Sequence, residues 1–323
     1  MQAVRCHTFG GPEALTYEAV ALPEPGVGQV RVKIEAIGVN YIDIYQRSGQ
    51  YPSHLPVIVG QEAAGVVDAV GTGVTDLQIG QRVAYIAQPG SAYAEFAVAP
   101  AGLVVPIPDG VETTTAAAVL WQGMTAHYLA MSTYPLKQGE TVLVHAAAGG
   151  VGQLLTQLAK RRGARVLATV STEEKAHVAQ AAGADEIIFY TQTDFAQEAK
   201  RLTGGSGVQV VYDSVGKTTF AGSLDALRTR GTLVLFGFSS GPVPPIAPQL
   251  LHRKGSLFLT RPSLEHYIAS REELLWRADD LFHWIKTGEL KVRVETTFPL
   301  TAASDAHRRL EGRQTTGKIL LIP

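Results

Sequence analysis

The stretch Val144-His145-Ala146-Ala147-Ala148-Gly149-Gly150-Val151-Gly152 decides the fold of this chain, because it joins an expected strand to an expected helix through a turn of very small residues. The apolar segment 141–146 predicts a buried parallel strand before the turn. At such a turn the backbone amides and the positive end of the helix face a bound anion, so the stretch is typical of a pyrophosphate site. The apolar residues that follow at helical spacing are Val151, Leu154, Leu155, Leu158 and Ala159.

The three glycines of this turn have different expected roles. We expect Gly149 and Gly150 to adopt backbone angles closed to other residues, and Gly152 to let the helix pack close to the sheet. Ala147 stands where the dinucleotide-binding fingerprint has its first glycine, which leaves A-x-G-x-x-G. The motif by itself is therefore also compatible with a tight turn in any α/β domain.

Strands and helices alternate after the turn. Thr172 is suited to cap a helix that has Glu173 and Glu174 in its first turn and ends at Gly183. The repeated β-α order predicts a doubly wound parallel sheet of the Rossmann type. The expected strands are 165–170, 186–189, 208–213 and 231–236, and the expected helices lie near 195–202 and 218–228.

The residues after the second expected strand bear on the choice of dinucleotide. NAD-binding sheets carry an acidic residue here for the ribose hydroxyls, whereas this chain has Val170, Ser171 and Thr172. A small hydroxyl leaves room for a 2′-phosphate, and Lys175 one turn later supplies the opposite charge, so we expect NADPH. The alternatives are that Lys175 is a solvated surface lysine, or that one of the two neighbouring glutamates binds the ribose of NADH.

Composition excludes several classes of protein. The 323 residues suggest about two domains, and 46% hydrophobic with 18% charged residues is typical of a globular chain. A net charge of −1 argues against nucleic acid as a partner. Residues 1–11 lack the features of a signal peptide, and no segment is long and apolar enough for a membrane span, so we expect a cytoplasmic protein without a membrane partner. Cys6 is the one cysteine, and the nine histidines lack metal-ligand spacing.

The first 120 residues predict a small β-barrel or sandwich, with strands at 30–37, 65–70, 82–85 and 93–98. A long helix at 271–286 and an apolar segment at 318–322 follow the nucleotide domain. We therefore expect the tail to complete the first domain, with domains of 1–122 plus 265–323 and of 123–264. The active site is expected in the cleft between them, near the carboxyl ends of the parallel strands. The expected turns of the first domain are Pro25-Gly26, Gly71-Thr72-Gly73, Ile79-Gly80 and Pro89-Gly90.

Ordered motifs along nearly the whole chain resemble the quinone oxidoreductases of the zeta-crystallin type, within the medium-chain dehydrogenase/reductase superfamily, and especially the bacterial NADPH-dependent ones. The resemblance implies a GroES-like β-barrel catalytic domain beside the Rossmann domain, an NADPH:quinone oxidoreductase activity and a homodimer. The motifs are Gly10-Gly11-Pro12-Glu13, Gly38-Val39-Asn40-Tyr41-Ile42-Asp43, Arg47-Ser48-Gly49, Gly60-Gln61-Glu62-Ala63-Ala64-Gly65, Tyr212-Asp213-Ser214-Val215-Gly216, Phe236-Gly237, Thr260-Arg261-Pro262-Ser263-Leu264 and Gly317-Lys318.

The zinc-dependent alcohol dehydrogenases of this superfamily have a cysteine where Asn40 stands and a histidine where Gln61 stands, together with a four-cysteine lobe that this chain lacks. We therefore expect no metal, and a hydrogen-bond donor that meets the oxyanion formed on the substrate. The resemblance places Asn40 and Asp43 beside the nicotinamide and Tyr45 and Tyr51 in the quinone pocket. The expected catalytic set is Asn40, Asp43, Tyr45, Arg47 and Tyr51.

Each of these residues also has a structural interpretation. The tyrosines could be aromatic plugs, Arg47 a salt-bridged surface residue, and Asp43 a group that orients a neighbour, which is the interpretation that we prefer for Asp43. Gln61 and Glu62 could be buried polar residues and no more.

The resemblance also implies a set of cofactor contacts. The glycine turn and Lys175 are the best supported by the residues themselves, whereas Tyr190 could instead be an aromatic at a strand end. The full set is Asn40, Tyr128, Gly149, Gly150, Val151, Gly152, Ser171, Lys175, Tyr190, Ser214, Phe236, Gly237, Phe238, Ser239, Thr260, Arg261 and Lys318.

Two alternatives to quinone reduction stay open. An NADPH-dependent reductase of enones or alkenals needs the same hydride geometry. A low-turnover NADPH-binding protein with a structural or RNA-binding role is the alternative from another class, which the near-neutral charge disfavours. For the homodimer, the segment 256–260 is the expected edge strand.

Overall fold

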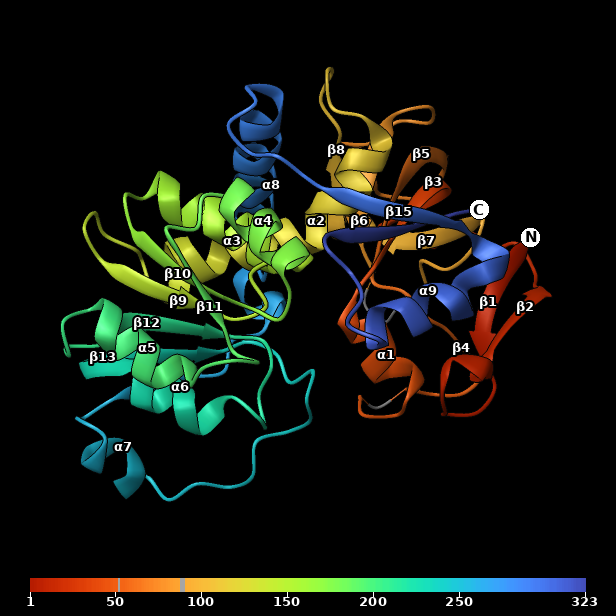
Figure 1. Ribbon diagram of the computed structural model, residues 1–323. Coiled ribbons are helices and arrows are strands. Elements are labelled where there is room, and N and C mark those ends of the chain that lie inside the picture. The colour runs from red at the N-terminus through yellow and green to blue at the C-terminus, as the bar shows by residue number, and fades with distance from the viewer. Residues whose placement is uncertain (52, 88–90) are drawn as a thin grey trace. The chain divides into compact units, whose positions relative to one another are not determined.

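The computed structural model describes residues 1–51, 53–87 and 91–323. The chain forms two compact units, one of Met1–Met124 with Ser270–Pro323 and one of Thr125–Ala269 (Figure 1). The domain boundaries predicted at 122 and 264 precede these boundaries by two and five residues. The turn expected at Pro89-Gly90 lies outside the described residues.

The second unit is built on a parallel sheet of six strands in the order β11-β10-β9-β12-β13-β14. The chain adds strands in one direction from β9 and then returns to add β12 on the other side. Since parallel crossovers are right-handed, the helices of the two halves cover opposite faces. This order confirms the predicted doubly wound sheet. The strands are β9 (Thr141–Val144), β10 (Arg165–Val170), β11 (Glu186–Phe189), β12 (Val208–Asp213), β13 (Leu227–Leu235) and β14 (Phe258–Thr260).

The helices of this unit pack in pairs, α3 against α4 and α5 against α6 (Figure 1). Thr172 caps α4 as predicted, because its side chain accepts a hydrogen bond from the amide of Lys175. The helix expected near 218–228 is shorter, since Leu227 already pairs with Val208 as the first residue of β13. The helices are α3 (Gly150–Arg161), α4 (Glu173–Ala181), α5 (Phe195–Leu202), α6 (Phe220–Ala226) and α7 (Gln249–Arg253), and a π-helical turn covers Leu129–Thr133.

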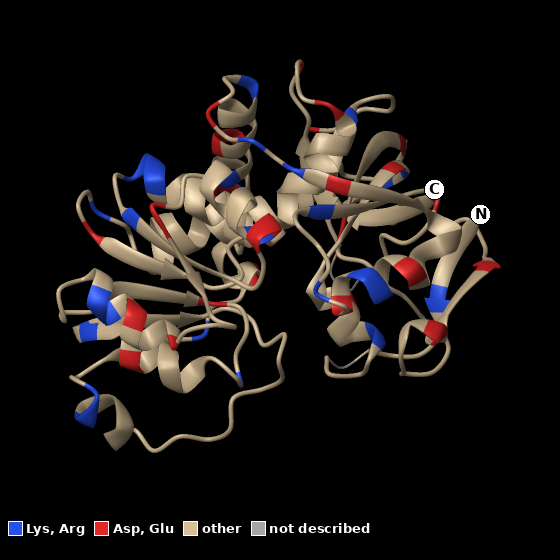
Figure 2. Cartoon of the chain, in the orientation of Figure 1, with Lys and Arg blue, Asp and Glu red and all other residues tan. Residues whose placement is uncertain are grey.

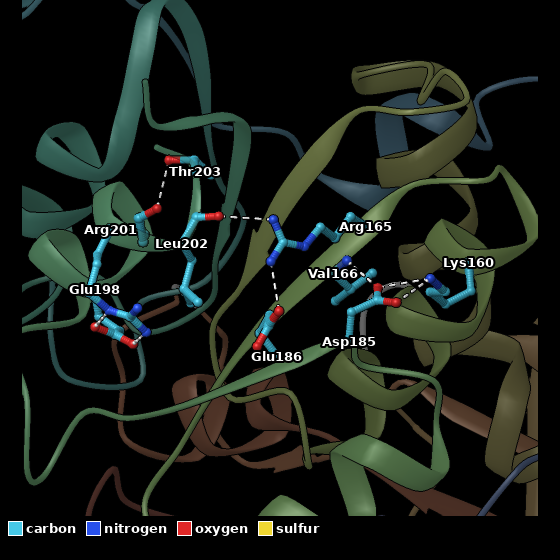
Figure 3. A network of polar contacts seen from close by, with 10 residues as sticks. Lys160, Arg165, Val166, Asp185, Glu186, Glu198, Arg201, Leu202 and Thr203 are labelled. Carbon is cyan, nitrogen blue, oxygen red and sulfur yellow. Dashed lines mark hydrogen bonds and ion pairs between the residues drawn. The ribbon is translucent and has the colours of Figure 1, made fainter. Parts of the chain in front are cut away.

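Charged side chains tie the amino ends of β10 and β11 to the helices around them (Figure 3). Arg165 donates to Glu186 at 2.6 Å and to the carbonyl of Leu202 at 2.9 Å. Asp185 accepts from the amide of Val166 at 2.7 Å and pairs with Lys160. These contacts lie at the edge of the sheet opposite to the carboxyl ends, so they stabilise the sheet without occupying the edge where ligands bind in such folds.

The glycine turn follows β9, at the point where the strand order reverses. A Cβ on Gly152 would lie 2.3 Å from the carbonyl oxygen of Ala146, so glycine is needed there for the close approach of helix and turn, as predicted. The expectation for the other two glycines is wrong. Gly149 has φ −75° and ψ 170°, and Gly150 is the first residue of α3, so both have ordinary backbone angles. The left-handed residue is Ala146, with φ 50°.

The first unit contains a seven-stranded sheet, in which β7 pairs with β3 beside the path β15-β16-β3-β5-β6-β8, and a smaller sheet β2-β1-β4. The tail completes it as predicted, because β16 pairs with β3 with Ile319 opposite Val39. The strands are β1 (Gln2–Cys6), β2 (Leu15–Ala19), β3 (Gln29–Val39), β4 (Val57–Ile58), β5 (Glu62–Val70), β6 (Arg82–Ile86), β7 (Phe96–Pro100), β8 (Val104–Pro106), β15 (Val294–Pro299) and β16 (Lys318–Ile322).

The strand expected at 93–98 starts later, at Phe96. Tyr93 and Ala94 contact β1 instead, through the bond from the amide of Val4 to the carbonyl of Tyr93 and a bridge between Ala3 and Ala94. The helices are α1 (Tyr41–Arg47), α2 (Thr113–Tyr128), α8 (Arg271–Lys286) and α9 (Ala303–Glu311), with 3-10 turns at Pro12–Ala14, Ala101–Leu103, Leu264–Tyr267 and Leu300–Ala302.

Figure 2 shows acidic and basic residues interspersed over both units, in keeping with the net charge of −1. Cys6 is a buried free thiol. Within residues 1–51, 53–87 and 91–323, the helices all fall short of the length and apolar character that crossing a membrane requires.

Candidate functional site

A buried polar cluster forms in the first unit where three strands end or begin. Asn40 follows β3 and is the N-cap of α1, Glu62 is the first residue of β5, and Lys318 is the first residue of β16. Since Ile319 lies opposite Val39 and Ala63 opposite Ile37, pairing of the strands brings the three side chains together.

Lys318 and Glu62 form an ion pair that is almost sealed from solvent. The Lys318 Nζ atom lies 2.6 Å from Glu62 Oε2 and 2.9 Å from Asn40 Oδ1, and the two ionised side chains are 1% and 0% exposed. The backbone amide of Trp121 donates to Glu62 Oε1. Gly38 leaves the room for this carboxylate, because a Cβ there would lie 2.3 Å from Glu62 Oε2.

The partners of Asn40 determine which way its amide points. Lys318 can only donate and a carboxylate can only accept, so Oδ1 faces the ammonium group and Nδ2 faces Glu62 at 2.9 Å. Nδ2 also donates to the carbonyl of Gly38, and Oδ1 also accepts from Gln122 Nε2 at 3.2 Å. Both amide hydrogens of Asn40 are thus engaged within the unit.

A second chain of hydrogen bonds starts at Asp43. Its Oδ2 atom accepts from the backbone amide of Asn40 at 2.8 Å and from the Tyr93 hydroxyl at 3.1 Å. Tyr93 lies 2.9 Å from Nε2 of His307, whose Nδ1 lies 3.1 Å from an Arg47 guanidinium nitrogen. Because the guanidinium can only donate, Nδ1 accepts and Nε2 carries the hydrogen. Every bond in this chain therefore points toward the carboxylate of Asp43.

Burial changes the proton affinities along this chain. It raises the pKa of Asp43 to about 7, and Asp43 Oδ1 has no hydrogen-bond partner among the described residues. Burial, together with the adjacent Arg47 guanidinium, lowers the pKa of His307 to about 3, so the ring is neutral at physiological pH. Asp43 caps α1 and holds the backbone of Asn40, which is the orienting position that we preferred for it.

Arg47 is ion-paired as expected, but the prediction that it lies at the surface is wrong. It is 2% exposed, because α9 covers it with His307 and Glu311. Its guanidinium donates to Glu311 at 2.6 Å and 3.1 Å, to His307 and to the carbonyl of Gly10. These contacts commit the guanidinium to the interior of the first unit.

The two tyrosines of the expected set contact each other. Tyr45 is 7% exposed, and its ring meets the half-buried Tyr51 edge to face at a centroid distance of 5.5 Å. Gln61 and Glu62 are buried, as the polar interpretation predicted, and Gln61 Nε2 donates to Gln46 at 3.3 Å. Glu62 does more than that interpretation allowed, since it neutralises Lys318. The signal that could have found it is a lysine in an otherwise apolar strand, which needs a carboxylate partner when buried.

Three strand ends of the second unit are joined by one chain of buried hydrogen bonds. His145, directly after β9, contacts Thr169 of β10 at 2.9 Å through Nδ1 and Ser223 of α6 at 3.0 Å through Nε2. Ser223 donates to Asp213, the last residue of β12, at 2.8 Å. Burial lowers the pKa of His145, although the charge of Asp213 acts in the opposite direction. These hydrogen bonds, which include the neutral imidazole of His145, therefore hold the three strand ends together next to the glycine turn.

Segments predicted to contact the cofactor begin at these strand ends. The carboxylate of Asp213 accepts from the amides of Val215 and Gly216 and shapes the turn that contains Ser214. Phe236 and Gly237 follow β13, and both amides donate to the carbonyl of Asp213.

The structure brings together the two residues predicted to select a 2′-phosphate. Ser171 directly follows β10, and Lys175 Nζ lies 3.4 Å from its Oγ atom. Both side chains are half-buried, whereas Glu173 and Glu174 are exposed.

The remaining predicted contacts occupy several places in the second unit. Arg261 lies over the ring of Phe238 at 5.7 Å from its centroid, and Thr260 ends β14. Tyr128 is 2% exposed and stacks on Tyr267 at 4.4 Å, and Tyr190 is 44% exposed beyond β11. Val151 is in the first turn of α3, and Ser239 donates its amide to the carbonyl of Ser214.

Comparison with known proteins shows the family of this chain. Residues 26–109 match the alcohol dehydrogenase GroES-like domain, and residues 150–273 match the zinc-binding dehydrogenase family. A quinone oxidoreductase of Pseudomonas aeruginosa is 46% identical over 98% of this chain and 97% of its own length. The chain belongs to the quinone oxidoreductases of the medium-chain dehydrogenase/reductase superfamily.

Two further relatives of this family are similar over the full length. The 2-haloacrylate reductase of a Burkholderia species is 44% identical, with 100% of this chain and 99% of that protein covered. The crystal structure of Escherichia coli quinone oxidoreductase complexed with NADPH superimposes with a TM-score of 0.98 at 43% identity, with 100% of both chains covered. Among the described residues, no group of three or more His, Cys, Asp or Glu is arranged to hold a metal ion.

Acidification tests the buried state of His307. The pKa of His307 is near 6.5 in the unfolded chain and about 3 in the folded chain. Below pH 6.5 the unfolded chain therefore binds a proton at His307 that the folded chain does not bind. The contribution of His307 to the free energy of unfolding therefore falls as the pH drops from 6.5 toward 3. At pH 5 this contribution is about 2 kcal/mol lower than at pH 7.5, and we expect His307→Gln to abolish this difference. Urea unfolding at both pH values measures it, with the exposed His252→Gln as control. Equal pH dependence in wild type and His307→Gln would contradict the prediction.

Proposed function

We propose that this chain is an NADPH:quinone oxidoreductase that works without zinc. The observation that carries the proposal is its similarity, over the full length of both chains, to a quinone oxidoreductase crystallised with NADPH. The family relationship supports the reaction class, and the described side chains support the choice of dinucleotide and the place of the substrate oxygen.

The second unit has the features that NADPH requires. The residues after β9 are small, so they leave the backbone amides at the start of α3 open to a pyrophosphate. Gly152 has no side chain that could block the approach. Ser171 and Lys175 supply a hydroxyl and a cation where NAD-binding sheets carry a carboxylate. In this proposal the dinucleotide is held by Tyr128, Gly149, Gly150, Val151, Gly152, Ser171, Lys175, Tyr190, Ser214, Phe236, Gly237, Phe238, Ser239, Thr260 and Arg261.

Asn40 and Lys318 have another role in the proposal than the cofactor contact first expected. Both are almost fully buried and use their polar atoms on each other and on Glu62. We assign to them the positioning of the polar groups next to them.

When bound, NADPH supplies the hydride from the C4 atom of its nicotinamide. The chain's own residues prepare the acceptor. Asp43, held by Tyr93, orients the backbone of Asn40, and the pair Tyr45 and Tyr51 offers aromatic edges to a planar quinone ring. The ion pair of Arg47 with Glu311 holds α1 against α9 and so stabilises the positions of Asp43 and Tyr45 in α1.

The side chains present at the positions of zinc ligands argue for zinc-free chemistry. Asn40 and Gln61 offer neutral amides, which are poor ligands for zinc. The ammonium group of Lys318 lies 2.9 Å from Asn40 Oδ1 and would repel a divalent cation at that atom. Stabilisation of the substrate oxyanion is then left to hydrogen-bond donors.

A reductase of activated carbon–carbon double bonds is the second candidate, and a specific observation favours it. The Burkholderia relative named 2-haloacrylate reductase is 44% identical, close to the value for the Pseudomonas quinone oxidoreductase. Both activities use the same hydride donor, and they differ in whether a carbon or an oxygen of the substrate is protonated.

Oxidation of NADPH tests the proposed activity directly. We expect the chelator-treated protein to oxidise NADPH rapidly with small quinones, slowly with enones and haloacrylates, and not with aldehydes. The absorbance of the nicotinamide measures all of these reactions. A preference for enones or haloacrylates would establish the second candidate, and loss of activity on chelation with recovery on added zinc would refute the zinc-free mechanism.

Lys175 should determine the preference for NADPH. A hydrogen bond to a charged group contributes about 1.5–3 kcal/mol, so Lys175→Ala is expected to raise the Kd for NADPH by roughly 10- to 100-fold and to leave the Kd for NADH almost unchanged. Titration followed by nicotinamide fluorescence measures both constants. Lys160→Ala is the matched control, because Lys160 pairs with Asp185 at the opposite edge of the sheet. An equal loss for both dinucleotides would show that Lys175 does not contact the 2′-phosphate.

We also propose a homodimer in the cytoplasm, where NADPH serves as the reductant. Strand β14 is at the edge of its sheet, and Phe258 at its start is 61% exposed. An open edge with an exposed aromatic favours pairing with a second copy. Light scattering should give the mass of two chains for wild type and for the control Trp276→Ser, and of one chain for Phe258→Asp. A monomeric wild type would refute the dimer.

A further inference from the structure

Gln122 is the outermost side chain of the buried cluster around Lys318. It lies in α2, next to Trp121, whose backbone amide binds Glu62. Among the four clustered side chains, Asn40, Glu62 and Lys318 are at most 3% exposed, whereas Gln122 is half-buried. A molecule that approaches this cluster from outside therefore meets the amide of Gln122.

The orientation of this amide follows from the cluster. Asn40 Oδ1 can only accept, so Gln122 must turn its NH₂ group toward it, and Nε2 lies 3.2 Å away. Asn40 Oδ1 is itself held by Lys318, and Asn40 Nδ2 by Glu62. Within the described part of the chain, the bond to Asn40 is the one hydrogen bond that the Gln122 side chain makes. The second N–H of its Nε2 atom thus remains for an acceptor outside the cluster.

We propose that Gln122 is a catalytic residue, which donates its second amide N–H to the quinone oxygen that becomes negatively charged. This inference rests on the proposed quinone reduction. In that reaction the quinone gains two electrons and one proton as a hydride, NADPH becomes NADP⁺, and the resulting hydroquinone anion takes its second proton from solvent. The negative charge develops on an oxygen atom, so a donor aimed at this atom lowers the barrier.

Asn40 and Lys318 act through Gln122 as positioning residues. The amide of Gln122 would otherwise rotate freely, but the acceptor atom of Asn40 holds one of its hydrogens and thereby fixes the direction of the other. Lys318 and Glu62 in turn fix Asn40 from both sides. A donor held in this way needs no reorganisation when the charge forms, which is the condition under which such donors contribute most.

The experiment compares side chains of similar size that differ in their ability to donate. Gln122→Leu and Gln122→Glu remove the N–H, whereas Gln122→Lys keeps a donor at this position. Since loss of one oxyanion donor costs about 10²- to 10³-fold in kcat, we expect kcat/KM for the quinone to fall by roughly that factor in the first two variants and to stay within about 10-fold of wild type in Gln122→Lys. The Kd for NADPH and the melting temperature should change little, and Gln78→Leu, an exposed glutamine of the same unit, is the control.

The outcomes separate this inference from the proposed function. If wild type reduces quinones and Gln122→Leu does so at the same rate, the proposed role of Gln122 is refuted while the proposed function stands. Equal losses in all three variants would show that only the shape of Gln122 matters and would also refute it. If wild type reduces no quinone, the proposed function fails and the inference fails with it. Should Gln122→Leu not fold, the comparison of Gln122→Glu with Gln122→Lys decides the question.

Discussion

The buried ion pair between Lys318 and Glu62 is the interaction on which the arrangement of the first unit depends. It joins the last strand of the chain to β5, and Asn40 after β3 is held between the two charges. Removal of one partner of such a pair typically costs about 3–5 kcal/mol, because the other charge stays buried without compensation. The pair therefore ties the tail to the place where the polar groups of the site are set, and Gly38 provides the space for it.

The second unit joins its strand ends through hydrogen bonds and not through a buried ion pair. The hydrogen bonds among Thr169, His145, Ser223 and Asp213 connect the ends of β10, β9 and β12. The imidazole of His145 is neutral, so it places no positive charge beside the glycine turn. It therefore does not compete with the amides of α3 or the cation of Lys175 for a bound anion. These hydrogen bonds lie at the carboxyl ends of the strands, where the strand order of the doubly wound sheet reverses.

Much of the fold could be predicted because neighbouring residues in the sequence indicate where its strands and helices lie. The strand Arg165–Val170 and the helix Arg271–Lys286 occur with the predicted bounds, since apolar spacing and caps are properties of neighbouring residues. The strand expected at 93–98 begins only at Phe96, because Tyr93 is bound by residues distant in the sequence. Arg47 was predicted to pair at the surface, but α9, about 260 positions later, covers it.

The sequence by itself determined the doubly wound sheet, the position of its glycine turn, the pairing of a hydroxyl with Lys175 after the second strand, and the neutral amides at Asn40 and Gln61. These features depend on residue type and on short spacing. Only the tertiary structure decided that both amide hydrogens of Asn40 are bound inside the unit, that Glu62 neutralises Lys318 and that Gln122 donates to Asn40. The physical reason is that hydrogen-bond capacity is shared among side chains brought together by strand pairing, and the sequence does not show which partners use it.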